Sequence, residues 1–142
     1  MASWSDSIVI LAPADRVFAY VDEPMRLPDW LPGMIEIRNV IGNGAGQQFE
    51  WTYKMAGLLL RGQATVVEHV PNNCAVHQSI GTVSSTFGYF VTSPGEETTL
   101  TLEIEYSMPL PVLGKWAAQL AVRRNAREFD MALANVKELL EG

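Results

Sequence analysis

Two histidines and a single cysteine are the side chains of this sequence best suited to bind a metal ion. His69, Cys74 and His77 lie close together, and Glu68 precedes the first of them. Their spacing gives neither an HxH nor an HxxxH pair, the patterns that set two ligands on one strand or helix. His77 falls in a stretch with strand-like alternation, and we interpret it as a histidine on the solvent side of that strand. We expect no metal ion and no cofactor.

Nucleophilic and acid–base catalysis have little local support. A Ser–His–Asp or Cys–His triad assembles in space, so spacing cannot exclude one, but no GxSxG elbow is present. By alternation Glu50, Glu103 and Glu105 fall on polar strand faces, whereas acid–base work needs a carboxylate in a dry pocket. The glycine-rich segment 42–46 joins strand to strand and lacks a following Lys-Ser/Thr pair. We therefore interpret it as a loop and not as a phosphate site.

Tyrosines are the better candidates for polar groups inside a pocket. Tyr53, Tyr89 and Tyr106 each lie on a strand face that is otherwise rich in apolar residues. A buried tyrosine hydroxyl needs a hydrogen-bond partner. That partner is either a backbone group or water, or else a carbonyl or hydroxyl of a ligand, and the sequence leaves both possibilities open.

Composition and charge restrict the class of protein. With 142 residues, 48% of them apolar and 18% charged, the chain suits one globular domain, which we expect to span residues 1–142. A net charge of −6 disfavours nucleic acid as a partner, because phosphate contacts require basic side chains. A lone cysteine allows no intramolecular disulfide. The sequence shows neither a secretory-signal pattern nor an apolar stretch long enough to span a membrane, so we predict a cytoplasmic protein.

The hydrophobic pattern predicts the elements that would position these side chains. Residues 8–11 end a first strand, and the apolar spacing within residues 14–21 predicts a short amphipathic helix. The proline-rich segment 22–32 allows only a short helical turn around Trp30. From residue 35 to residue 108 the period is two, which predicts about six strands with short, and therefore antiparallel, connections.

The rest of the chain is predicted to form a long helix ending near Leu140. One apolar stripe of this helix comprises Val122, Ala126, Phe129, Leu133, Val136 and Leu140. Leu113, Trp116 and Leu120 lie nearly opposite that stripe. The helix is therefore expected to bend or break near Ala121, or else its first turns present apolar surface outside the core.

Such a surface suggests two kinds of partner. One is a second copy of the chain, giving a homodimer through Leu113, Trp116 and Leu120. The other is transient contact with a membrane surface, in which the arginines at positions 123, 124 and 127 would join the apolar patch. The arginines are equally explained as a solvated helix face with internal ion pairs.

Two segments near the start of the chain resemble a known superfamily. Ala12–Phe18 (APADRVF) followed by Leu27–Gly33 (LPDWLPG) is similar to the opening of START-like proteins of the polyketide cyclase/dehydrase type (SRPBCC, Bet v 1-like). The resemblance covers nearly the whole chain. It implies an α+β helix-grip fold, in which a curved antiparallel sheet of about seven strands wraps around a long C-terminal helix. Two short helices would follow the first strand.

The same resemblance implies a cavity for hydrophobic small molecules such as lipids, quinones or polyketides. Members range from carriers to enzymes and share no catalytic motif, so catalytic residues stay unknown. The main hypothesis is binding or carriage of a hydrophobic small molecule between sheet and final helix. Strand alternation and the helix pattern give the candidate lining: Trp30, Trp51, Tyr53, Phe87, Tyr89, Leu102, Ile104, Tyr106, Phe129 and Leu133. The alternatives are a cyclase/dehydrase-like enzyme that uses the pocket tyrosines, and an interaction module that uses the start of the last helix.

Overall fold

The computed structural model describes residues 2–55, 57–93, 96–107 and 110–141, with side chains for all of these except 110–113, 115, 117 and 118. The protein contains a seven-stranded antiparallel sheet with the strand order β1-β7-β6-β5-β4-β3-β2. The strands are β1 (Ala2–Ile10), β2 (Met34–Ile41), β3 (Gln48–Met55), β4 (Leu58–Val70), β5 (Cys74–Gly81), β6 (Ser85–Thr92) and β7 (Thr98–Tyr106). Strands β2 to β7 follow one another as neighbours, and β1 pairs with β7.

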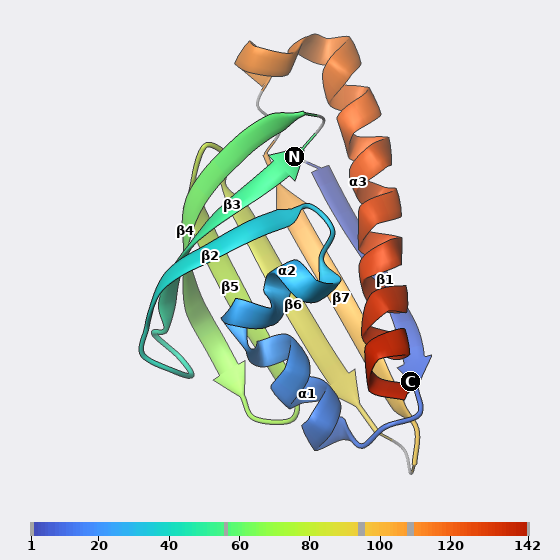
Figure 1. Ribbon diagram of the computed structural model, residues 1–142. Helices are drawn as coiled ribbons and strands as arrows, with labels where there is room; N and C mark the ends of the chain where they lie inside the picture. Colours follow the sequence, from blue (N-terminus) through green and yellow to red (C-terminus); the bar gives the residue numbers. More distant parts are fainter. Residues whose placement is uncertain (1, 56, 94–95, 108–109, 142) are drawn as a thin grey trace.

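The helices lie on the concave side of this sheet (Figure 1). They are α1 (Ala14–Asp22), the 3-10 turn η1 (Pro24–Arg26), α2 (Leu27–Trp30) and the long α3 (Leu110–Glu141). The strands curve around them, and α3 runs lengthwise next to β1. This arrangement confirms the predicted α+β helix-grip fold, including the two short helices after the first strand.

Proline placement explains how the first helices begin. Pro13 caps α1, where a missing N–H costs nothing, and Pro24 and Pro28 occupy the first turns of η1 and α2. The buried side of α1 consists of Val17, Phe18 and Val21, the stripe expected from the sequence.

Helix α3 differs from the prediction in two respects. Gly114 has φ 75° and ψ 167°, so the helix is kinked there and not near Ala121. A left-handed φ is readily adopted only by glycine, which explains the position of the kink. The buried stripe is also rotated in the first half of the helix: Ala121 and Asn125 are buried, whereas Val122 and Ala126 are only half-buried. From Phe129 onward the predicted stripe is correct.

Candidate ligand-binding cavity

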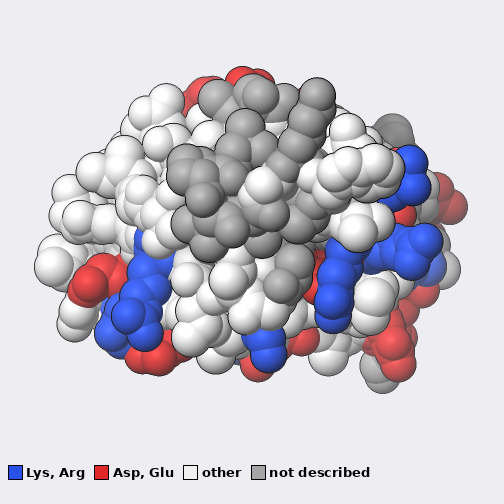
Figure 2. Space-filling model, turned by 90° about the horizontal axis from the view of Figure 1, so that it is seen from above, with Lys and Arg blue, Asp and Glu red and all other residues white. Residues whose placement is uncertain are grey.

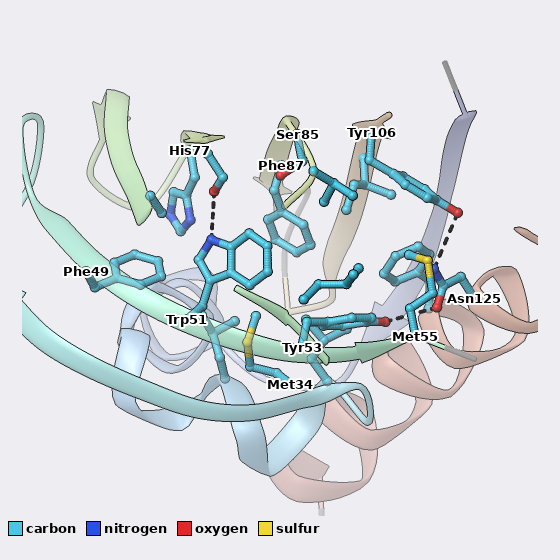
Figure 3. Close-up of a pocket in the computed structure, with 18 residues that line it drawn as sticks. Met34, Phe49, Trp51, Tyr53, Met55, His77, Ser85, Phe87, Tyr106 and Asn125 are labelled. Carbon is cyan, nitrogen blue, oxygen red and sulfur yellow. Dashed lines mark hydrogen bonds between the residues drawn. The ribbon is translucent and has the colours of Figure 1, made fainter. Parts of the chain in front are cut away.

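A cavity of about 80 Å³ lies between the concave face of the sheet and α3 (Figure 3). Its wall is made by 18 residues from α2, from the strands β2 to β7 and from α3, together with Leu31 after α2 and Val83 between β5 and β6. Most of them are aliphatic or aromatic. The polar groups in the wall are the hydroxyls of Tyr53, Tyr106, Ser79 and Ser85, the imidazole of His77, the indole N–H of Trp51 and the amide of Asn125. None of these 18 residues carries a formal charge at neutral pH when His77 is neutral.

The structure places only part of the sequence-predicted lining on this wall. The predicted residues that line the cavity are Trp51, Tyr53, Phe87, Ile104, Tyr106 and Phe129. The predicted residues that do not are Trp30, Tyr89, Leu102 and Leu133, all of which are buried in the core. Whether any of them contacts a ligand stays a prediction.

Tyr89 and Leu102, which pair with each other across β6 and β7, lie off the wall for one physical reason. Alternation identifies the face of a strand that is buried, but it does not show how far along the strand a helix covers that face. Helix α1 packs on the second half of β6, where the ring centroid of Phe18 lies 5.8 Å from that of Tyr89. The cavity therefore ends at Phe87, and Tyr89 lies beyond it. Trp30 is fully buried, and its indole Nε1 has no hydrogen-bond partner among the described residues.

Several wall residues were missed by the sequence prediction. They are Leu27, Leu31, Met34, Phe49, Met55, Leu60, Ala64, His77, Ser79, Val83, Ser85 and Asn125. Phe49 and Met55 could have been found, because they share a strand face with Trp51 and Tyr53. The small and polar residues gave no such signal.

At the end of the cavity near α3, Asn125 links two tyrosines from distant strands. The hydroxyl of Tyr53 lies 3.3 Å from Asn125 Oδ1 and 3.0 Å from a carboxylate oxygen of Glu128, and either oxygen can accept its single proton. Asn125 Nδ2 donates to the hydroxyl of Tyr106 over 3.5 Å. Burial raises the pKa of Tyr53, and the neighbouring Glu128 carboxylate raises this pKa further. Burial also raises the pKa of Tyr106, so both phenols stay protonated at neutral pH.

His77 lies at the opposite end of the cavity, and its placement corrects the sequence interpretation. Its side chain is on the inner face of β5 and is only 6% exposed, so it is not a solvent-side histidine. The rings of Phe49 and Tyr89 surround it, each with a centroid 5.4 Å from that of the imidazole. Burial lowers the pKa of His77 to about 4, and the imidazole is therefore neutral at neutral pH.

A chain of hydrogen bonds connects His77 with the surface. His77 Nε2 lies 3.2 Å from the hydroxyl of Tyr89, and this hydroxyl donates to a carboxylate oxygen of Asp22 at the end of α1. The other carboxylate oxygen of Asp22 lies 2.9 Å from His69 Nε2. Burial, followed by the hydrogen bond to Asp22, raises the pKa of Tyr89. Tyr89 thus holds His77 in place from outside the cavity.

The described residues contain no group of three or more His, Cys, Asp or Glu side chains that could hold a metal ion. Across the same described ranges, no helix is long and apolar enough to cross a membrane.

A curved antiparallel sheet around a long helix, with an apolar cavity between them, defines a START-like helix-grip protein. Residues 1–141 match the family described as "Polyketide cyclase / dehydrase and lipid transport", and the chain belongs to this family. Comparison with curated proteins found no match.

Solved structures with similar folds cover nearly the whole chain. The protein TTHA0849 from Thermus thermophilus has a TM-score of 0.83 and 19% identity, with 97% of this chain and 96% of that chain covered. A START superfamily protein from Mycobacterium smegmatis has a TM-score of 0.74 and 16% identity over 98% and 99% of the chains. The Zhui aromatase/cyclase from Streptomyces sp. R1128 has a TM-score of 0.73 and 14% identity over 96% and 93%. Because the sequence identities are this low, the similarity shows a shared fold alone.

Proposed function

We propose that the protein binds or carries an uncharged hydrophobic small molecule, such as a lipid, quinone or polyketide-like compound, in the cavity between the sheet and α3. The single observation that carries this proposal is the wall itself, which is largely aromatic and aliphatic with a few polar groups. Such walls are typical of small-molecule sites. Apolar ligand surface removed from water would supply about 25 cal/mol per Å².

The cavity is smaller than a typical site for a small molecule, so it would have to enlarge when a ligand binds. Pockets for drug-sized ligands typically measure roughly 300–1,000 Å³, whereas this cavity measures about 80 Å³. Met34 and Met55 belong to its wall, and methionine side chains adapt their shape more readily than branched or aromatic ones. We therefore propose that ligand binding enlarges the cavity by moving these two side chains.

The charges nearest the cavity favour an uncharged ligand. Asp22 is paired with His69, and Glu128 accepts from Tyr53 and lies 4.0 Å from Arg124. A ligand carboxylate inside the cavity would find no cationic side chain in the described wall, and burying an unpaired charge is costly.

Calorimetry and thermal unfolding with the methyl ether of β-naphthol, an uncharged aromatic probe, test the proposal. Binding to the folded state should stabilise the protein by about 2.7 kcal/mol when free probe is a hundredfold above its Kd. The control variant is Ala64→Leu, because Ala64 lines the cavity and a larger side chain there fills it. The proposal predicts weaker binding in this variant. Absence of both heat and stabilisation in the wild-type protein with this ether, and equally with β-naphthol itself, would overturn it.

Catalysis of the cyclase/dehydrase type by the tyrosines has less support than binding. The pKa values of Tyr53, Tyr89 and Tyr106 are all raised, chiefly by burial. Phenols with raised pKa values serve as hydrogen-bond donors at neutral pH, not as general bases. We therefore assign Tyr53 and Tyr106 to ligand orientation.

A self-association surface at the start of α3 is a second candidate function. Trp116 is 83% exposed and Leu120 is 63% exposed, while the side chain of Leu113 lies outside the described residues. Viewed onto the end of the molecule where α3 begins, charged side chains lie mainly toward the periphery of the described surface (Figure 2). We propose that a second copy of the chain covers Trp116 and Leu120. Membrane contact and cytoplasmic location remain predictions from sequence.

A further inference from the structure

The hydrogen bonds around Tyr89 determine which nitrogen of His77 carries the proton. A carboxylate can only accept, so the Tyr89 hydroxyl uses its single proton to donate to Asp22. Toward His77 the same oxygen must then act as an acceptor, over 3.2 Å. His77 Nε2 therefore carries the hydrogen. In a neutral imidazole this leaves Nδ1 as an acceptor.

His77 Nδ1 has no hydrogen-bond partner among the described residues. Trp30 Nε1 is the one side-chain nitrogen or oxygen in the described part of the chain that is both sealed off and unpartnered. His77 Nδ1 is thus unpartnered without being sealed off, as expected for an atom on the cavity surface. Burial lowers the pKa of His77 to about 4, and this keeps Nδ1 available as an acceptor at neutral pH.

Ser79 supplies a donor next to this acceptor. It lies two residues after His77 on the same face of β5, and residues so placed are roughly 6.6 Å apart. Ser79 Oγ accepts a hydrogen bond from Trp51 Nε1 over 3.1 Å, which fixes the position of the oxygen (Figure 3). Its own hydroxyl proton has no acceptor among the described residues, and both side chains belong to the cavity wall.

We propose that His77 and Ser79 form a hydroxyl-binding subsite, so that the cavity selects uncharged apolar molecules carrying an alcohol or phenol group. A hydroxyl donates one hydrogen bond and accepts another, which matches the acceptor on His77 and the donor on Ser79. A carbonyl or an ether oxygen can only accept, and it leaves His77 Nδ1 unpaired. This inference rests on the proposed function and names the class of ligand for the same cavity.

A matched pair of probes tests the subsite separately from the cavity. β-Naphthol and its methyl ether have the same rings, but only the naphthol can donate. The wild-type protein should bind the naphthol about tenfold more tightly, because leaving a buried polar group unpaired carries a free-energy cost. His77→Phe should remove this preference. The control Phe87→Leu changes another wall residue, one that pairs with His77 across β5 and β6. It should weaken the binding of both probes by the same factor.

The outcomes of these binding measurements distinguish the subsite proposal from the ligand-binding proposal. Equal affinity of the wild-type protein for both probes would overturn the subsite and leave the ligand-binding function standing. A preference that persists in His77→Phe would also overturn the subsite. Binding of neither probe would overturn both proposals.

Nitrogen NMR spectroscopy of the wild-type imidazoles tests the same inference without replacing His77. The protein has two histidines, so a His69→Gln sample assigns the resonances. The inference predicts a proton on His77 Nε2 and a shift of the Nδ1 resonance with β-naphthol that its methyl ether does not produce. A proton on Nδ1, or equal responses to the two probes, would overturn it.

Discussion

Gly62 on β4 leaves open the space in which the indole of Trp51 on β3 lies. A Cβ atom at position 62 would come within 2.4 Å of Trp51 Cζ2. Because the glycine has no side chain, the indole can lie across β4 and reach Ser79 on β5 with its Nε1. One glycine thus positions both a large part of the cavity wall and the hydroxyl of Ser79.

Substituting Gly62 by alanine should therefore destabilise the protein by about 1–3 kcal/mol, as overpacking of a well-packed interior does. Urea unfolding measures this effect. In a Trp51→Phe background the same substitution should cost about 1 kcal/mol less, because the smaller ring removes the clashing atom. An equal penalty in both backgrounds would show that the indole and Gly62 are not coupled.

The hydroxyls of Tyr53 and Tyr106 should contribute differently to stability. Tyr53→Phe removes the one hydroxyl donor that faces Glu128 and Asn125 and should lower the free energy of unfolding by about 1–2 kcal/mol. Tyr106→Phe removes only a long contact of 3.5 Å with Asn125 and should cost about 0.5 kcal/mol. Chemical denaturation of the two variants provides the comparison. A larger loss for Tyr106→Phe would contradict the assigned roles.

The buried His77 should make stability fall in mild acid. Its pKa is about 4 in the folded protein, against the usual 6.5 that applies to the unfolded chain. Above about pH 6.5 the imidazole is neutral in both the folded and the unfolded state, so the full free energy of unfolding is present. As the pH falls from about 6.5 toward about 4, the unfolded chain takes up a proton that the folded protein does not. The free energy of unfolding should then decrease by up to about 1.4 kcal/mol per pH unit.

His77→Phe is the control for this pH dependence. The variant lacks the titrating group, and its unfolding free energy should change less steeply between about pH 5 and about pH 6.5. Denaturant unfolding of both proteins at several pH values gives the two slopes. Equal slopes for the wild-type protein and His77→Phe would mean that the fold does not hold His77 neutral.

The exposed apolar start of α3 should promote self-association. Trp116→Lys is expected to shift the protein toward the monomer in sedimentation velocity, since removing an aromatic contact from an interface centre costs about 1 kcal/mol or more. Met131→Lys is the matched control, because Met131 is 54% exposed on the same helix but far from Trp116 along it. If Trp116→Lys and the wild-type protein sediment alike at every concentration, Trp116 does not form such an interface.

The fold was largely predictable because its signals are local. Strand β4 spans Leu58–Val70, and the sequence marks both of its ends, since a glycine precedes it and Pro71-Asn72-Asn73 follows it. The period of two continues through the strands up to β7, and short connections between them require antiparallel pairing. The apolar pattern of α3 predicted either a bend near Ala121 or exposed apolar surface in the first turns, and Trp116 and Leu120 are exposed. The kink lies at Gly114 because of its φ, which that pattern does not encode.

The cavity was less predictable because its small residues depend on side chains from other strands. Ala75, His77 and Ser79 look like a polar strand face, and His77 was assigned to solvent on that basis. The large rings of Phe49 and Trp51 extend from β3 toward β5, so the inner face of β5 carries small and polar residues. Asn125 is polar within an apolar helix stripe for a similar reason, since it bonds two tyrosines of the sheet. These contacts join residues that are far apart in the sequence, so they produce no periodic pattern in it.

The most direct test of a ligand-binding cavity is a crystal structure of the protein grown with saturating β-naphthol. The ligand-binding account predicts density for the two rings among Trp51, Phe87 and Phe129, with Met34 or Met55 displaced to make room. A cavity that keeps its present side-chain positions, without ligand density in crystals grown at saturating naphthol, would contradict it.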